Sequence, residues 1–129
     1  MTPQETLLLT RYVKACCPQQ AMDDFTPDAW HDLLGDLTLA DCRAAVVAVA
    51  KSQPFVAPFE IRAEVRRARN ERIMDAGGVP APPPELIDNP AAYSAALRAA
   101  ATALADGRDP HAAMQAIARQ AARLELEAS

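Results

Sequence analysis

Apolar residues recur at intervals of three and four along most of this chain, which is the spacing of one face of an α-helix. The first such run spans residues 3–16 and stops before Pro18. Thr2 can cap this run, and Pro3 suits a first helical turn. The apolar residues that share one face are Leu8, Leu9, Tyr12, Val13 and Cys16. The pattern therefore predicts an α-helix over 3–16.

A second helix is predicted over 25–37. Thr26 can cap it, and Pro27 occupies the first helical position. Phe25 and Trp30 stand at the two positions that form a hydrophobic staple. The expected buried face comprises Trp30, Leu33, Leu34 and Leu37.

The third apolar run, 38–52, contains both valines and alanines. Valine favours a strand, whereas alanine and the capping-box-like pair Thr38 and Asp41 favour a helix. Its apolar stripe comprises Cys42, Ala45, Val46, Val49 and Ala50. We expect a helix here, with a strand as the alternative.

A proline-rich loop leads into the fourth predicted helix, 58–75. Pro54 and Pro58 restrict the backbone on both sides of the loop, and Pro58 can open the helix. We expect Phe55 and Phe59 to anchor the loop in the core and thereby to set the angle of the helix. The inward-facing residues of the helix would be Ile61, Val65 and Ala68.

The outer surface of 58–75 is the only part of the chain that is not acidic, with five arginines and four acidic residues. Arg62, Arg66 and Arg69 follow one line along the helix and can face DNA or another protein. The glutamates between them allow a second interpretation. The surface would then be a solvated helix face on which Glu and Arg form salt bridges at i,i+3 and i,i+4. The residues of that ladder are Glu60, Glu64, Arg67 and Glu71.

Residues 76–89 separate these helices from the rest of the chain. They hold two glycines and four prolines, a composition typical of an extended, semi-rigid linker. Two alanine-rich runs follow, 90–106 and 110–127, joined by the turn sequence DGRDP. The expected fold class is therefore all-α, with a compact N-terminal bundle of about four helices (1–75), the linker, and an amphipathic helical hairpin or tail (90–129).

The predicted hairpin has narrow apolar stripes, so it buries little surface on its own. Either it binds a partner or it folds back on the N-terminal domain, and both alternatives stay open. The large apolar residues of the two stripes are Tyr93, Leu97, Leu104, Met114, Ile117 and Leu124.

Composition narrows the classes of function. The chain has 129 residues, a net charge of −4 and three cysteines, two of them adjacent. This charge argues against a general DNA-coating protein. The odd cysteine count argues against a disulfide framework, so we expect reduced, buried thiols and a cytoplasmic protein. We expect neither a signal peptide nor a membrane-spanning segment.

No combination of residues predicts catalysis. His31 and His111 lack a nucleophile or carboxylate at a catalytic spacing. The chain has no CxxC motif for zinc, and AGGVP reads as linker and not as a phosphate-binding loop. We therefore expect a protein that is not an enzyme, with no catalytic residues, no metal and no cofactor.

Three segments share their order of features with a known family. They are LLLTRYVKACCPQQ, FTPDAWHDLLGDL and CRAAVVAVAKSQPFVAPFEIRAEVRR. The positions that carry the pattern are Pro18, Thr26, Trp30, Phe55, Pro58, Glu60, Ile61 and Arg62. Over about residues 5–70, the chain resembles the N-terminal domain of phage replicative-helicase loader/inhibitor proteins.

The resemblance implies an all-helical N-terminal domain, no catalytic residues, and a C-terminal tail that engages a hexameric, DnaB-type replicative helicase. Such proteins hold the helicase inactive and deliver it to an initiator-bound origin. The family's tail is largely unstructured, whereas 90–127 is predicted to be helical here, so we expect a different mode of binding.

On this basis each candidate surface has an expected partner. The residues expected to face the helicase are Tyr93, Leu97, Leu104, Met114, Ile117 and Leu124. Arg62, Arg66 and Arg69 are expected to face an origin-binding initiator or, weakly or indirectly, DNA. Two other functions remain as alternatives: a small helical DNA-binding regulator, and an oligomerising structural protein with the tail as its dimer seam.

Overall fold

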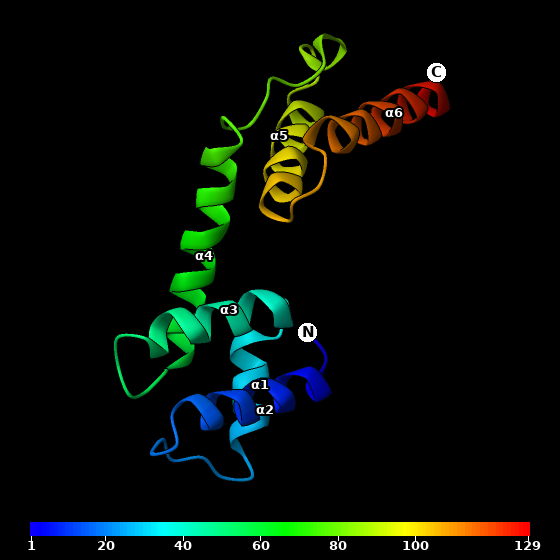
Figure 1. Ribbon diagram of the computed structural model, residues 1–129. Coiled ribbons are helices and arrows are strands. Elements are labelled where there is room, and N and C mark those ends of the chain that lie inside the picture. Colours follow the sequence, from blue (N-terminus) through cyan, green and yellow to red (C-terminus); the bar gives the residue numbers. More distant parts are fainter. The chain divides into compact units, whose positions relative to one another are not determined.

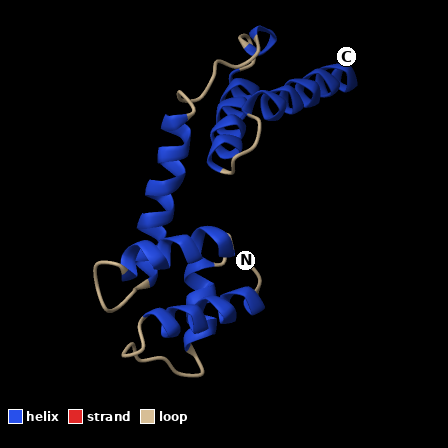
Figure 2. Cartoon of the chain, in the orientation of Figure 1, coloured by secondary structure: helices blue, strands red, loops and turns tan.

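The protein is built entirely from helices. The computed structural model describes residues 1–129 and contains six α-helices and one short 3₁₀ helix, with no strand (Figure 1, Figure 2). The helices are α1 (Pro3–Cys16), α2 (Thr26–Leu34), α3 (Leu39–Ala50), α4 (Pro58–Asp75), η1 (Pro84–Leu86), α5 (Pro90–Ala105) and α6 (Pro110–Ala128). The predicted all-α fold is confirmed, and the run 38–52 forms a helix and not a strand.

The chain divides into two compact units, Met1–Ala68 and Arg69–Ser129. The sequence predicts a boundary in the linker 76–89, whereas this division falls within α4. Arg69 and Arg72, on the part of α4 that belongs to the C-terminal unit, bond to the end of α5.

The core of the N-terminal unit gathers one face from each of the helices α1 to α4. Helix α1 packs against both α2 and α3. The buried residues are Leu9, Val13, Cys17, Trp30, Leu34, Cys42, Ala45, Val46, Val56, Ile61 and Val65. Trp30 is the protein's only tryptophan, so its fluorescence reports on this unit alone.

Side-chain caps fix where these helices begin. At α1 the Glu5 amide donates to the Thr2 hydroxyl (3.1 Å), and the Thr2 amide donates to the Glu5 carboxylate (2.8 Å). At α3 the Asp41 amide donates to the Thr38 hydroxyl (3.2 Å), as predicted. These bonds satisfy amides that have no partner inside the helix.

The start of α2 differs from the prediction. Thr26 is the first helical residue, and the carboxylate of Asp23 accepts from the amides of Phe25 (2.8 Å) and Thr26 (3.1 Å). The predicted cap at Thr26 is therefore wrong, because its hydroxyl accepts from the amide of Asp23 (3.0 Å) and the amide of Ala29 donates to the carbonyl of Phe25. Phe25 is 78% exposed and forms no staple with Trp30, and Leu33, expected to be buried, is 54% exposed.

The loop before α4 is held by side-chain amides and not by its phenylalanines. The Gln20 side chain bonds both backbone groups of Val56, donating to the carbonyl and accepting from the amide, each at 2.8 Å. Val56 is 1% exposed and belongs to the core. Phe55 and Phe59 are 50% and 74% exposed, so their predicted role as anchors is wrong.

Two further side chains close this loop. Glu60 accepts from the amide of Ala57 (2.9 Å), and Gln53 donates to the carbonyl of Phe55 and to Glu60. Pro58 opens α4, as predicted. The position of the loop thus depends on polar contacts to its backbone.

The C-terminal unit is a helical hairpin closed by small side chains. Helix α5 is capped by Asn89, whose side chain accepts from the amide of Ala92 (3.1 Å). Helix α6 is capped by Asp109, whose side chain accepts from the amide of His111 (2.9 Å). Between them Gly107 has a φ of +74°, a left-handed conformation that suits glycine. The core consists of Leu86, Ala96, Ala100, Met114 and Ala118.

The linker is partly ordered against this unit. At the end of α4 the Gly78 amide donates to the carbonyl of Ile73 (2.9 Å), and Gly77 and Gly78 both have positive φ angles. This arrangement is typical of a helix C-terminus. Further along, η1 buries Leu86 against the hairpin, so the linker is not extended throughout. No helix of the protein has the length and apolar content needed to cross a membrane.

We predict that Gln20→Ala destabilises the N-terminal unit by about 1–3 kcal/mol, because it leaves two backbone groups of Val56 without partners. Urea unfolding followed by Trp30 fluorescence measures this loss. Gln19→Ala, an exposed neighbour without such bonds, is the matched control. Equal unfolding midpoints for the two variants would show that the Gln20 contacts do not hold the loop.

Candidate protein-binding surfaces

Arg62 is held in a bidentate ion pair just beyond the end of α2. Its guanidinium donates to both carboxylate oxygens of Asp36 (2.7 and 2.9 Å) and to the carbonyl of Leu33 (2.9 Å). The hydrogen bond from Arg62 is the main reason that the pKa of Asp36 falls from 3.8 to about 2. Arg62 therefore joins α4 to the segment after α2. The terminal nitrogen atoms of its guanidinium already donate to Asp36 and Leu33.

Arg69 and Arg72 are engaged at the C-terminal end of α5. Arg69 donates to the carboxylate of Asp106 (2.7 Å), which also accepts from Arg108 (3.0 Å). Hydrogen bonds from Arg108 and Arg69 lower the pKa of Asp106. Arg72 donates to the carbonyl of Ala105 (2.7 Å), in the last turn of the helix. Cations at this end of a helix also interact favourably with its dipole.

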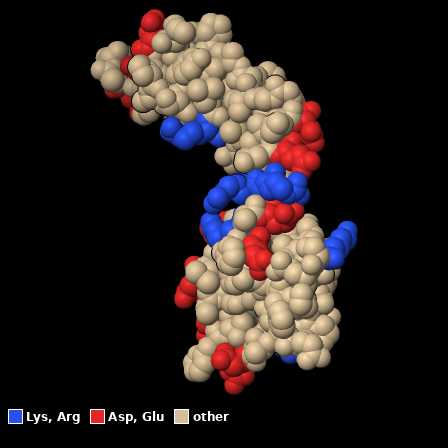
Figure 3. Space-filling model, turned by 90° about the vertical axis from the view of Figure 1, so that its left-hand side faces the viewer, with Lys and Arg blue, Asp and Glu red and all other residues tan.

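Two of the three arginines in the predicted row, Arg62 and Arg69, are held in ion pairs. Arg62 and Arg66 belong to the N-terminal unit and Arg69 to the C-terminal unit. Arg66 is exposed, and no hydrogen bond or ion pair engages it. On the face shown in Figure 3, a group of basic side chains lies with acidic side chains directly beside it. The expected pair of Glu64 and Arg67 is present, with a shortest contact of 2.6 Å.

The six hairpin residues expected to face the helicase are also dispersed. Met114 is 1% exposed and lies inside the hairpin, where no partner can contact it. Ile117 and Leu124 line an open groove. The remaining three lie outside that groove: Tyr93, Leu97 and Leu104.

The groove lies between the N-terminal half of α5 and the C-terminal half of α6 and has a volume of about 400 Å³. Its α5 side is made of alanines, and its α6 side carries the larger apolar residues. The lining comprises Ala91, Ala92 and Ala95 from α5, Ile117, Ala121, Leu124 and Ala128 from α6, and the polar residues Asn89, Gln120 and Glu125. A concave, mostly apolar surface with a few polar groups is suited to binding.

The C-terminal half of α6 is uncovered. Every residue from Ala122 to Ser129 is exposed, and in Figure 1 this end of the helix points away from α5. Leu124 and Leu126 are 54% and 76% exposed. Leu124 lines the apolar groove, so its exposure indicates a contact outside the hairpin, whereas Leu126 lies outside the groove lining.

His31 makes a contact between two helices. His31 lies 2.9 Å from the hydroxyl of Thr6 and so links α2 to α1. No three His, Cys, Asp or Glu residues are grouped so that they could hold a metal ion.

Cys17 and Cys42 are buried, and desolvation is the main cause that raises the pKa of Cys42 to about 11. Cys16 is exposed because it ends α1 on the solvent side, so the expectation of three buried thiols is wrong.

No family model, curated protein or solved structure matches this chain.

The alanine side of the groove differs from the face expected for α5. The expected stripe of α5 comprised Tyr93, Leu97, Ala100 and Leu104, whereas the buried contact with α6 uses Ala96 and Ala100. Closely packed helices place small side chains at their contact, which turns the large ones toward its edges. The available signal was the excess of alanine over large apolar residues within α5.

We predict that lowering the pH from about 4 to about 2 removes a stabilising contribution of Asp36. The folded-state pKa of Asp36 is depressed, so its contribution is present above the ordinary value of 3.8 and is lost as the pH falls toward 2. In Asp36→Asn this part of the pH dependence should disappear. Urea unfolding followed by Trp30 fluorescence at several pH values tests this. Asp32→Asn, at an exposed residue without an ion pair, should retain the wild-type slope.

We also predict that one of the three thiols reacts rapidly with a water-soluble thiol reagent in the native protein. Cys16 is exposed, whereas Cys17 and Cys42 are 2% and 0% exposed. A colorimetric assay should give one fast thiol per chain, none in Cys16→Ser, and all remaining thiols after unfolding. A fast thiol that persists in Cys16→Ser would contradict the burial of the other two.

Proposed function

We propose that this chain is a non-enzymatic adaptor of phage or prophage DNA replication. It binds the hexameric, DnaB-type replicative helicase in the cytoplasm and loads or restrains it at the origin. The reason for naming this partner is the resemblance of the N-terminal segments to the family of helicase loader/inhibitor proteins. The open apolar groove of the hairpin is the observation that carries the proposal, because it offers a binding surface on a unit with its own core.

Within this proposal the helicase contact centres on Ile117 and Leu124. Both line the groove, and Leu124 is 54% exposed. Met114 keeps the two helices of the hairpin together from inside and supports this surface indirectly. The groove therefore replaces the wider set of six residues as the helicase-facing surface.

The second contact of the adaptor, to an origin-bound initiator, belongs to the N-terminal unit. Arg62 and Arg69 are held in ion pairs, which leaves Arg66 as the exposed member of the row. Phe55 and Phe59 are exposed near the start of the same helix. Aromatic and arginine side chains are enriched at the centres of protein interfaces, so these three residues support a protein contact more than a DNA contact.

The proposal predicts a stable complex between the full chain and the host's replicative helicase in the presence of ATP. Size-exclusion chromatography with light scattering measures it. Leu124→Asp should weaken the complex at least about tenfold, because it places a charge in an apolar contact. Leu126→Asp makes the same change two residues away, outside the groove, and should leave the affinity unchanged.

Absence of a complex with the wild-type chain would contradict the helicase proposal. A DNA affinity that falls steeply with salt would then favour the DNA-binding regulator. A dimer that dissociates on dilution would favour the oligomerising structural protein.

A further inference from the structure

The apolar residues of α6 repeat at the spacing of a coiled-coil seam. Separated alternately by three and four residues, they are Met114, Ile117, Ala121, Leu124 and Ala128. Burial falls along this series: Met114 is 1% exposed, Ile117 and Ala121 are half-buried, and Leu124 is 54% exposed. One seam therefore begins against α5 and continues where no helix covers it.

The shape of the groove specifies a helical occupant. A seam with this spacing is complementary to the side chains of another α-helix, which insert between its residues. On the α5 side the groove carries only small apolar residues, Ala91, Ala92 and Ala95. The incoming helix must therefore bring large apolar side chains, because the alanines leave the space for them.

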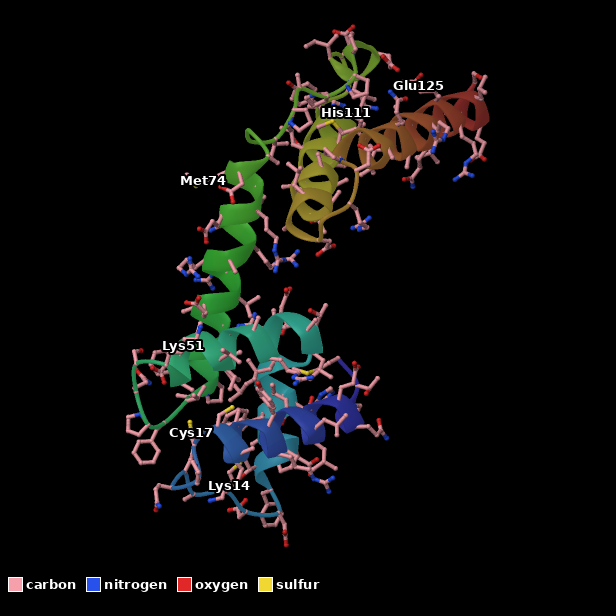
Figure 4. All side chains as sticks on the ribbon, in the orientation of Figure 1. Lys14, Cys17, Lys51, Met74, His111 and Glu125 are labelled. Carbon is pink, nitrogen blue, oxygen red and sulfur yellow. The ribbon has the colours of Figure 1, made fainter.

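The charges beside the seam are acidic. Glu125 lines the groove and lies on the C-terminal half of α6 (Figure 4), and by helical spacing Glu127 flanks the seam on its other side. The arginines of this helix, Arg119 and Arg123, lie with Ala116 along a separate shallow depression. The border of the groove thus has negative charge without a compensating cation among its lining residues.

This charge distribution separates two classes of occupant. A helix with Lys or Arg beside its apolar stripe is complementary to Glu125 and Glu127. A second copy of α6 would instead bring these glutamates against their own equivalents, and like charges at such positions are unfavourable. The charges therefore favour a different protein over self-association.

We propose that the groove binds a basic amphipathic α-helix of the partner, with large apolar residues spaced by three and four and Lys or Arg beside them. The inference rests on the proposed function in so far as the partner is the helicase, and it specifies which kind of element the hairpin takes. The hairpin and the incoming helix together form a three-helix bundle.

Two synthetic peptides test this inference with the full chain. Each has about 21 residues, three heptads, with leucine at the seam positions. One carries Lys and the other Glu at the flanking positions, and they are otherwise identical. In fluorescence anisotropy the Lys peptide should bind at least about tenfold more tightly than the Glu peptide, and added salt should reduce the difference. Equal binding of the two peptides, or no binding of either, would overturn the inference.

Two variants test whether the peptide binds in the groove. Glu125→Lys should abolish or invert the preference for the Lys peptide. The double variant Ala116→Lys and Ala122→Lys adds the same charge away from the groove and should retain the preference. Circular dichroism checks that each variant keeps its helix content. A preference that survives Glu125→Lys would overturn the role of this glutamate in the groove.

The remaining outcomes separate this inference from the helicase proposal. A helicase complex that the Lys peptide cannot displace would overturn the groove inference and leave the adaptor standing. Binding of the Lys peptide without any helicase complex would contradict the adaptor and support the groove inference. A dimer of the chain alone that Leu124→Asp dissociates would overturn the inference in favour of a second copy.

Discussion

Alanine determines both the geometry and the limits of the C-terminal unit. Its methyl groups at Ala96, Ala100 and Ala118 let α5 and α6 pack closely, but each removes little apolar surface from water. The large side chains in this core are Leu86 and Met114. The hairpin consequently has a thin core, and the second half of α6 relies on the helix propensity of its own residues and not on packing. The groove stays open because these small side chains do not fill the space between α5 and α6.

The N-terminal unit is organised by a different balance of forces. Its apolar core includes a tryptophan and several branched aliphatic residues, and polar contacts then fix the segments that the core does not hold. Gln20 fixes the loop at Val56, and Arg62 fixes α4 to the segment after α2 through Asp36. Gln20 holds the loop through its backbone, so the loop does not need the side chain of Phe55 in the core. The exposed Phe55 follows from this arrangement and not from poor packing.

The sequence predicted the helices well, because their signals are local. Caps at Thr2 and Thr38 mark helix starts that the structure has within a residue of the prediction, and the runs predicted from residues 90 and 110 begin there in the structure. Burial was harder to predict where two candidates compete for the same space. The choice of Val56 over Phe55 depends on the side chain of Gln20, 36 residues earlier in the chain, and no local pattern contains that contact.

The candidate site was predicted only in part for a related reason. Periodicity places Ile117 and Leu124 on one face of α6 but does not say how far the neighbouring helix covers that face. Likewise, the arginines of α4 share a line in sequence, but their partners Asp36 and Asp106 come from distant segments. Long-range ion pairs between charged side chains leave no periodic trace in a sequence.

In the proposed binding mode, the exposed residues of the groove are distinct from the buried residues that keep the hairpin folded. Ala91, Leu124 and Ala128 are exposed in the free chain, so changing them removes few contacts from the core. Substitutions there would alter the proposed binding surface at little cost in folding free energy, whereas changes at Ala100 or Met114 would disturb the core. If the groove binds a partner as proposed, a lineage of such chains can adapt to changes in that partner through substitutions on one surface while the core stays constant.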